Sequence, residues 1–233
     1  RELHEMNATK DKFFSIISHD LKNPALAQRN ALQALVNDAA ELDAESLSHY
    51  YAMLLKSADA QVELLYNLLD WARVQTGRIP FTPVTFSLSR VVEDEVSLMH
   101  MPIESKSIRL TVDVSDNLCA NADRNMVATV LRNLLTNAIK FSHPEGRIAI
   151  SARQDGAWIT ISVADDGVGM SADKLRTLFD AGREQSTRGT RGETGSGLGL
   201  VVCKHFVERN GGRLTAHSEE SRGTTFHFTL KAK

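Results

Sequence analysis

The stretch Arg147–Gly169 reads RIAISARQDGAWITISVADDGVG and decides the fold of the larger part of the chain. It contains two runs in which apolar and polar residues alternate, joined by Gln154-Asp155-Gly156. This pattern is typical of a β-hairpin, so the sheet is expected to be at least partly antiparallel. Helical segments occur on both sides of the hairpin, and we expect them to cover one face of the sheet. The sequence therefore predicts an α/β sandwich.

This sandwich is expected to occupy residues 86–233. Its helices are expected at about 87–101, 123–141, 171–179 and 198–210, and its strands at about 107–114, 147–154, 157–165, 212–218 and 224–231. Gly77, Pro80 and Pro83 mark a linker before it, which we place at 77–85.

The composition of the chain is ordinary overall but unevenly distributed. Of 233 residues, 42% are hydrophobic and 24% charged with a net charge of −2, which excludes a disordered chain and a global positive field for nucleic acid. None of the 14 glycines precedes Gly77, and eight lie between Gly167 and Gly199, so two different architectures are expected. The sequence contains no run of about 18 apolar residues, so no membrane span is predicted. The two cysteines are expected to be buried thiols, and the start at Arg1 suggests a fragment of a longer protein.

The glycine-free residues 1–76 predict a hairpin of two helices, separated near 37–44, with Asp43 as the cap of the second helix. That helix carries apolar or small residues at heptad spacing, which we call the seam: Tyr51, Leu55, Ala58, Val62, Leu65, Leu69 and Ala72. A hairpin of this size cannot enclose a core alone. We expect two copies to form a four-helix bundle, and the alternative is that the hairpin packs on its own C-terminal half.

The first helix has a buried stripe and a polar side. A rotation of about 100° per residue predicts that one set of residues shares the buried stripe: Phe13, Ile17, Leu21, Pro24, Gln28 and Leu35. His19 falls on the solvent side, and Asn23 lies beside it one turn later. Because Asp20 follows His19 and a proline inside a helix tends to distort it, His19 is a candidate nucleophile. The other seven histidines are interpreted as ordinary residues.

Three clusters in residues 86–233 point to nucleotide chemistry. The first is Asn133-Leu-Leu-Thr-Asn137-Ala-Ile-Lys140-Phe141, in which Asn133, Asn137 and Lys140 align on one flank of a helix. Amide oxygens suit Mg²⁺, and an ammonium group neutralises phosphate, so this flank suits a Mg²⁺–triphosphate. The alternative is the polar rim of an amphipathic helix.

The second cluster is Asp165-Asp166-Gly167-Val168-Gly169, at the end of a predicted strand. Strand alternation places Asp165 on the same face as the apolar residues, where a carboxylate is costly unless donors satisfy it. The exocyclic amine of adenine is such a donor, and Gly167 and Gly169 would let the backbone pass close to the base. The alternative reading is an acidic turn.

The third cluster is Gly195-Ser-Gly197-Leu198-Gly199-Leu200, followed by an apolar helical run. Glycines before a helix N-terminus leave backbone N–H groups that bind phosphate, although this spacing matches neither a dinucleotide-binding fingerprint nor a P-loop. The preceding loop, Ala181–Thr194, contains Arg188 and Arg191 and is predicted to be a cationic lid over a nucleotide. A solvated loop would have the same composition.

Together these motifs resemble the cytoplasmic core of a sensor histidine kinase, in which a HisKA-type dimerisation and phosphotransfer hairpin precedes a GHKL-type ATP-binding domain. The resemblance covers essentially the whole chain. Its motifs occur in the family's order: Phe13–Pro24 looks like the H box, Asn133–Phe141 the N box, Asp165–Gly169 the G1 box, Leu178-Phe179 the F box, Gly195–Leu200 the G2 box and Gly223–Phe226 the final G box.

The resemblance implies a role for each matching residue. His19 would be the phosphoacceptor, Asp20 would orient or deprotonate its imidazole, and Asn23 would align a hydrolytic water in a phosphatase reaction. Asn137 would hold Mg²⁺, with Asn133 as a second ligand and Lys140 at the phosphates. The nucleotide would also be bound by residues of the other boxes and the lid: Asp165, Gly167, Gly169, Phe179, Arg188, Arg191, Gly195, Gly197, Leu198, Gly199 and Thr224.

The implied activity is autophosphorylation of His19 from Mg·ATP, followed by transfer to an aspartate of a response-regulator receiver domain. The implied partners are a second copy of the chain, that receiver domain and an upstream sensor region absent from this chain, with no nucleic acid. The implied location is the cytoplasm, with a full-length protein either soluble or anchored in a membrane. The alternatives are another GHKL ATPase, a serine-directed kinase, or a degenerate dimeric scaffold.

Overall fold

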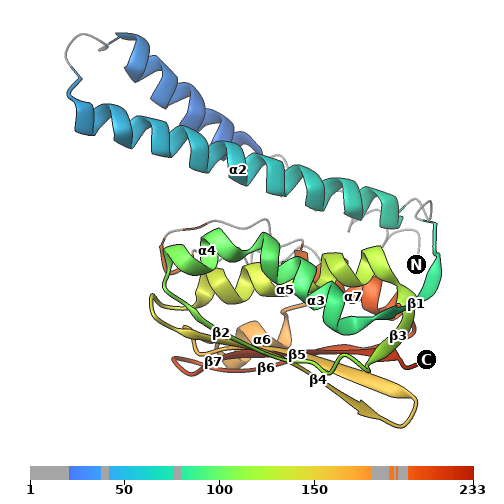
Figure 1. Cartoon of the computed structure of the whole chain (residues 1–233). Coiled ribbons are helices and arrows are strands. Elements are labelled where there is room, and N and C mark those ends of the chain that lie inside the picture. Colours follow the sequence, from blue (N-terminus) through green and yellow to red (C-terminus); the bar gives the residue numbers. More distant parts are fainter. Residues whose placement is uncertain (1–20, 38–41, 76–79, 180–188, 192, 194–198) are drawn as a thin grey trace.

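The structure is a computed structural model of the chain, and it describes residues 21–37, 42–75, 80–179, 189–191, 193 and 199–233. A helical N-terminal part is followed by an α/β domain (Figure 1). Residues 21–37 are helical, and the long helix α2 (Ala44–Gln75) returns beside them. Asp43 caps α2 as predicted, because its Oδ1 accepts a hydrogen bond of 2.8 Å from the Ser46 amide.

The hairpin leaves much of its expected contact surface exposed. The exposed members of the seam are Tyr51, Leu55, Val62, Leu65 and Leu69, whose exposed fractions range from 43% to 65%. Leu21 was predicted to be buried and is 47% exposed, whereas Ala31 further along the helix is 2% exposed. Pro24 does not interrupt residues 21–37, which are helical throughout. Phe13 and Ile17 lie outside the described residues.

The α/β domain is built on a mixed five-stranded sheet of order β2-β4-β5-β7-β6. The strands are β2 (Arg109–Asp113), β4 (Arg147–Asp155), β5 (Trp158–Asp165), β6 (Leu214–Glu219) and β7 (Gly223–Lys231). The pair β2–β4 is parallel and the other pairs are antiparallel. The predicted hairpin is confirmed, because β4 and β5 pair directly with Asp155 opposite Trp158.

A second, two-stranded sheet was not predicted. Strand β1 (Pro83–Ser87) pairs antiparallel with β3 (Cys119–Asp123), and Pro83 lies opposite Asp123. The beginning of β1 lies within the expected linker 77–85. Strand β1 is short and begins with a proline, although Val84, Thr85 and Phe86 favour a strand, and Asn and Asp in β3 have low strand propensity, so the pair had no clear local signal. Their pairing depends on tertiary contacts.

Helices cover one face of the five-stranded sheet, and α2 lies on the far side of the helical layer (Figure 1). These helices are α3 (Leu88–Leu98), α4 (His100–Ser105), α5 (Arg124–Phe141) and α7 (Gly199–Arg209), and the short α6 (Ala172–Arg176) precedes α7 in the chain. One helix was predicted at 87–101, but the helical residues divide into α3 and α4 at Met99, which has φ −97° and ψ 6°.

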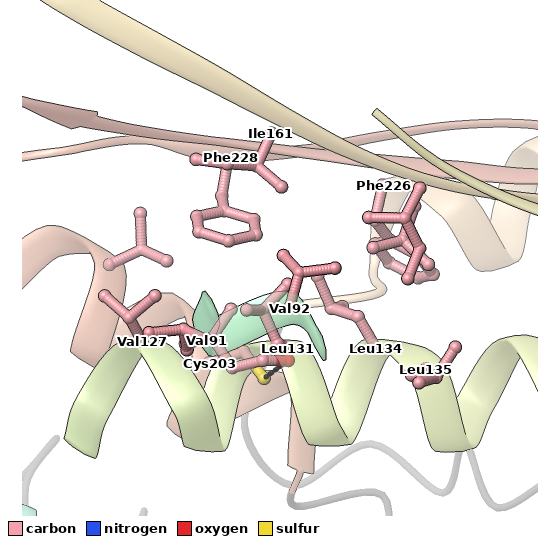
Figure 2. Packing of buried hydrophobic residues seen from close by; sticks show 14 of the residues in the cluster. Val91, Val92, Val127, Leu131, Leu134, Leu135, Ile161, Cys203, Phe226 and Phe228 are labelled. Atoms are coloured by element: carbon pink, nitrogen blue, oxygen red, sulfur yellow. Dashed lines mark hydrogen bonds between the residues drawn. The ribbon is translucent and has the colours of Figure 1, made fainter. Parts of the chain in front are cut away.

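The core lies between the helical layer and the sheet. Figure 2 shows Phe228 and Ile161 of the sheet pointing toward Val127 and Leu131 of α5, and each of these side chains is at most 2% exposed. Leu64 of α2 is also buried and belongs to the same cluster, and α2 contacts α7. Burial of one stripe of α5 leaves a different edge of that helix available for polar residues.

Candidate nucleotide-binding site

Helix α5 carries the first predicted cluster along one edge. Asp123 caps the helix, because its Oδ1 accepts hydrogen bonds from the amides of Asn125 and Met126 at 3.1 and 3.2 Å. Asn133 and Asn137 are half-buried and stand one turn apart, beside the buried stripe of the helix. The sequence expectation for this edge depended only on helical periodicity, which the structure preserves.

The two amides have different surroundings. Asn133 donates a 3.0 Å hydrogen bond from Nδ2 to the Thr129 carbonyl, so its Oδ1 is the end left to accept or coordinate. Asn137 has no side-chain hydrogen bond to another of the described residues. Asn133 can therefore present an oxygen to a hard cation, and Asn137 can present either an oxygen to a cation or a nitrogen to phosphate.

Gly199, the first residue of α7, lies against Asn133. A Cβ atom at Gly199 would overlap Asn133 Oδ1, so a larger residue here would force the Asn133 side chain to move. The N-terminal turn of a helix has unsatisfied N–H groups that favour anions. The contact therefore brings an anion-binding helix end beside an amide oxygen.

Asp165 ends strand β5 in the inward-facing position that the sequence predicted. Its Oδ1 accepts hydrogen bonds from the amides of Gly167 at 3.0 Å and Thr224 at 3.3 Å. Its Oδ2 accepts none from the other described residues. Thr224 is 7% exposed, and its hydroxyl lies 2.9 Å from that of Ser218. The second oxygen of Asp165 is thus available to a donor from outside the protein.

Burial has a strong effect on the acidity of this carboxyl. The pKa of Asp165 is raised to about 6, because burial and the neighbouring charge of Asp166 outweigh the two backbone hydrogen bonds that lower it. A donor that approaches Oδ2 would favour the ionised form. Such a perturbed carboxyl is typical of a functional site.

The turn after Asp165 is held against the end of α5. The Val168 amide donates a 3.1 Å hydrogen bond to the Phe141 carbonyl, and a Cβ atom at Gly167 would overlap that same carbonyl. Gly169 follows beside the backbone of Glu219. The first two predicted clusters, far apart in sequence, therefore meet at the C-terminal end of α5.

Three further predicted site residues, Lys140, Phe179 and Arg191, are among the described residues. Lys140 is near the end of α5, and its Nζ stands 4.7 Å from the centroid of the Phe141 ring. Phe179 is half-buried and packs against the core. Arg191 donates a 2.8 Å hydrogen bond to the Ser105 carbonyl at the end of α4, and its own carbonyl accepts one of 3.4 Å from Lys56 of α2.

Part of the predicted site falls outside the described residues. This holds for the proposed phosphoacceptor and its neighbour and for most of the lid and the third cluster: His19, Asp20, Arg188, Gly195, Gly197 and Leu198. Asn23 is described, and it is exposed on the helix 21–37. The candidate site therefore consists of the α5 edge, the Asp165 turn and the start of α7.

One group of residues near the site was not predicted. The buried ammonium of Lys106 contacts the end of α5 and residues 189–193, where it pairs with Glu193 at 2.6 Å. In the sequence, Lys106 stands among Glu104, Ser105 and Ser107, which is typical of a surface turn. Because its partners are distant in sequence, no local signal could have identified it.

A metal-binding cluster of side chains and a membrane-spanning helix are both absent from the described residues. Within that part of the chain, no three His, Cys, Asp or Glu side chains form a group able to hold a metal ion. Any cation at the α5 edge would therefore depend on amide oxygens and on oxygens of its ligand. Among the same residues, no helix has the length and apolar character needed to cross a bilayer.

Two family models match the chain, one for each part. Residues 9–77 match the His Kinase A (phospho-acceptor) domain. Residues 122–233 match the histidine kinase-, DNA gyrase B- and HSP90-like ATPase. The first range contains His19 and the second contains the α5 edge, Asp165 and Gly199.

Curated relatives match nearly the whole chain. A non-motile and phage-resistance protein of Caulobacter vibrioides is 29% identical over 232 residues, which are 97% of this chain and 28% of that protein. The sensor-like histidine kinase SenX3 of Mycobacterium tuberculosis is 28% identical over 228 residues, or 97% of this chain and 55% of that protein. The chain thus spans between about a quarter and about half the length of these relatives.

Solved structures share the fold. The histidine kinase ThkA in complex with response regulator protein TrrA has a TM-score of 0.76 at 18% identity, covering 99% of this chain and 64% of that one. Full-length ShkA in complex with AMPPNP has a TM-score of 0.65 at 22% identity, covering 94% and 46%. With a phospho-acceptor domain and a histidine kinase-type ATPase domain in this order, the chain belongs to the sensor histidine kinases.

Proposed function

We propose that this chain binds ATP with Mg²⁺ at the site on α5 and transfers the γ-phosphoryl group to His19. The observation that carries the proposal is that one chain joins a phospho-acceptor domain containing His19 to an ATPase-type domain with an available buried carboxylate. ShkA, whose fold this chain shares, was solved in complex with AMPPNP, a nucleotide of the expected class.

The adenine would be bound at Asp165. Its Oδ2 would accept the hydrogen bond of the exocyclic amine, while the amides of Gly167 and Thr224 hold Oδ1 in place. The triphosphate would extend toward Asn133, Asn137 and the start of α7. Backbone N–H groups there and the ammonium of Lys140 would offset its charge.

The amides of the α5 edge fit Mg²⁺ that arrives with the nucleotide. Mg²⁺ commonly takes few protein ligands and completes its shell with water and phosphate oxygens. Asn137 and Asn133 would each contribute an amide oxygen. Bound there, the cation would neutralise charge on the triphosphate and help align it.

The acceptor reaction would take place on the first helix of the hairpin. The bond between the γ-phosphorus and the ADP oxygen would break as a bond to an imidazole nitrogen of His19 forms. Asp20 would orient the ring and take up the proton displaced from it. The products would be ADP and phosphohistidine.

The phosphoryl group would then pass to an aspartate of a receiver domain. ThkA, whose fold this chain shares, was solved in complex with a response regulator protein. Asn23, four residues after His19 in the sequence, is exposed and could align a water for the dephosphorylation of that receiver. The stimulus would come from a sensor region outside this chain.

The stability of the phosphorylated product tests the proposal. After incubation with γ-labelled ATP and Mg²⁺, we expect the protein to carry label that is lost in acid and retained in alkali, as for a P–N bond. Acid-stable label would contradict histidine phosphorylation and favour a serine-directed kinase. ATP hydrolysis without labelled protein would favour another GHKL ATPase, and absence of nucleotide binding would favour a scaffold.

The exposed seam of α2 supports a dimer as part of this function. Five large side chains at heptad spacing are exposed on one helix, and an apolar stripe of this kind is typical of an interface. A HisKA-type domain implies dimerisation. We therefore propose that two hairpins bury their seams against each other in a four-helix bundle.

Changing Leu65→Glu is expected to weaken dimerisation by about 30-fold or more, since a buried hot spot contributes ~2 kcal/mol or more. Leu65 is 52% exposed in the single chain, so the substitution leaves the core intact. Sedimentation equilibrium measures the change. The control is Leu98→Glu, on α3 at 62% exposure, which should stay dimeric. Equal dissociation constants for both variants would refute the seam as the interface.

A further inference from the structure

The ammonium of Lys106 is buried at the C-terminal end of α5. Lys106 is 3% exposed, and its Nζ donates hydrogen bonds to the carbonyls of Ile139 at 2.8 Å and Lys140 at 3.0 Å. These carbonyls belong to the last turn of α5, where carbonyls lack partners within the helix and a positive charge is favourable. Lys106 therefore caps the helix that carries Asn133 and Asn137.

The same ammonium contacts residues 189–193. It donates to Thr190 Oγ1 at 2.8 Å and pairs with Glu193 Oε1 at 2.6 Å. The other oxygen of Glu193 accepts a 2.7 Å hydrogen bond from the Arg191 amide, and the Glu193 carbonyl accepts one of 2.8 Å from Gly189. Thr190 and Arg191 are therefore in a turn beside Glu193, and the ammonium contacts both Thr190 and Glu193.

This turn is attached directly to α5 as well. The Thr190 amide donates a 3.1 Å hydrogen bond to the Lys140 carbonyl, and its hydroxyl lies 2.7 Å from the Ser142 carbonyl. A Cβ atom at Gly189 would overlap Lys140. The turn and the end of α5 therefore share one set of hydrogen bonds, with Lys106 at its centre.

Stability alone does not account for this ion pair, in which Lys106 is buried and the Glu193 side chain is 31% exposed. Removing the ammonium from water is costly, and a well-packed apolar side chain often gives equal or greater stability at such a position. The buried ammonium is better explained where it specifies one arrangement of the chain. Lys106 and Glu193 specify where residues 189–193 meet α5.

The location of the pair connects it to the candidate site. Glu193 lies shortly before Gly199 in the sequence, and Gly199 is held against Asn133 in the middle of α5. The connection that contains Gly195 and Gly197 is thus attached to α5 at both of its described ends. The same pair also bears on the described part of the site, because Lys106 and Thr190 both donate to the carbonyl of Lys140, whose ammonium is proposed to offset the charge of the triphosphate.

We infer that Lys106 and Glu193 are positioning residues for the nucleotide, which raise its affinity by fixing residues 189–193 on the end of α5. This inference depends on the proposed nucleotide site. It differs from that proposal in assigning a role to two residues that do not themselves contact ATP. Their effect would pass through the carbonyls of Ile139 and Lys140 to the end of α5 that carries Lys140.

The variant Glu193→Gln tests the inference, because it keeps the shape of the side chain and removes the charge that pairs with Lys106. We expect the dissociation constant of Mg²⁺–trinitrophenyl-ATP to rise about fivefold, at a temperature where both proteins are fully folded. The matched control is Asp113→Asn, which removes the acidic partner of Arg153 at the edge of the sheet, away from the site. It should bind as the wild type does.

A double variant distinguishes positioning from general stability. If Lys106 and Glu193 act as a pair, Lys106→Met with Glu193→Gln should bind no more weakly than the weaker single variant. Unchanged affinity in Glu193→Gln would overturn the inference, as would fully additive losses. Failure of the wild-type protein to bind the probe would instead overturn the proposed nucleotide site.

Discussion

Changing Asp165→Asn is expected to weaken binding of Mg·ATP by about 100-fold, or ~3 kcal/mol. The variant keeps an oxygen for the amides of Gly167 and Thr224, but its other end becomes an NH₂ group. That group would face the exocyclic amine of adenine, so one hydrogen bond is lost and two donors oppose each other. Isothermal titration with Mg·ATP measures the change directly.

The adjacent residue provides the control for this prediction. Asp166 is exposed, and its Oδ1 accepts a 2.7 Å hydrogen bond from the Arg147 amide, which an asparagine can also accept. Asp166→Asn removes the same charge one residue away and should alter the affinity by less than about twofold. Equal affinities for the two variants would show that Asp165 does not contact the nucleotide.

The pH dependence of binding follows from the same carboxyl. Burial raises the pKa of Asp165 to about 6, and the hydrogen bond from adenine requires the ionised form. Affinity should therefore be highest above this pKa and fall as the pH decreases through it. ATP itself titrates near pH ~6. The effect of Asp165 is consequently the difference between the wild-type profile and that of Asp165→Asn, and parallel profiles would contradict it.

Local periodicity predicted much of this site. Two-residue alternation in β5 predicted that Asp165 faces inward, and helical rotation predicted that Asn133 and Asn137 share an edge of α5. Both patterns hold because the burial of apolar neighbours fixes the orientation of the polar residues between them. The hairpin turn at Asp155 gave the antiparallel pair of β4 and β5 for the same local reason.

Contacts between distant segments were not predictable in this way. Lys106 and Glu193 are far apart in sequence, and each has the appearance of a surface charge in its own segment. Strand β3 contains Ala, Asn and Asp, which give no strand signal, and its formation depends on pairing with β1 and on a bridge between Ala120 and Ala232. These features depend on the assembled fold, whereas Asp165 and the α5 edge depend on their own elements.

Helix α2 combines two arrangements that the sequence left as alternatives. Leu64 is 4% exposed and belongs to the core cluster of the α/β domain, so the hairpin does pack on its own C-terminal half. Its neighbour Leu65 is 52% exposed on the seam. Adjacent residues point to different sides of a helix, so one face can contact the ATP-binding domain while the other remains for a second copy.

Changing His19→Gln is expected to abolish the acid-labile label completely, which is a larger effect than any change in binding. Glutamine keeps polarity but lacks a nucleophilic ring nitrogen, so no P–N bond can form. Affinity for Mg·ATP should remain that of the wild type, because His19 belongs to the acceptor and not to the nucleotide site. His49→Gln, which changes an exposed histidine on α2, should label normally.

Mixing two inactive variants extends this test to the dimer. His19→Gln retains the proposed nucleotide site, and Asp165→Asn retains the acceptor, so a mixed dimer has one intact copy of each on different subunits. Label in the mixture would show transfer between subunits, and no label would show transfer within one. Label on His19→Gln alone, still labile in acid, would overturn the assignment of His19, because the phosphoryl group would then be on another histidine.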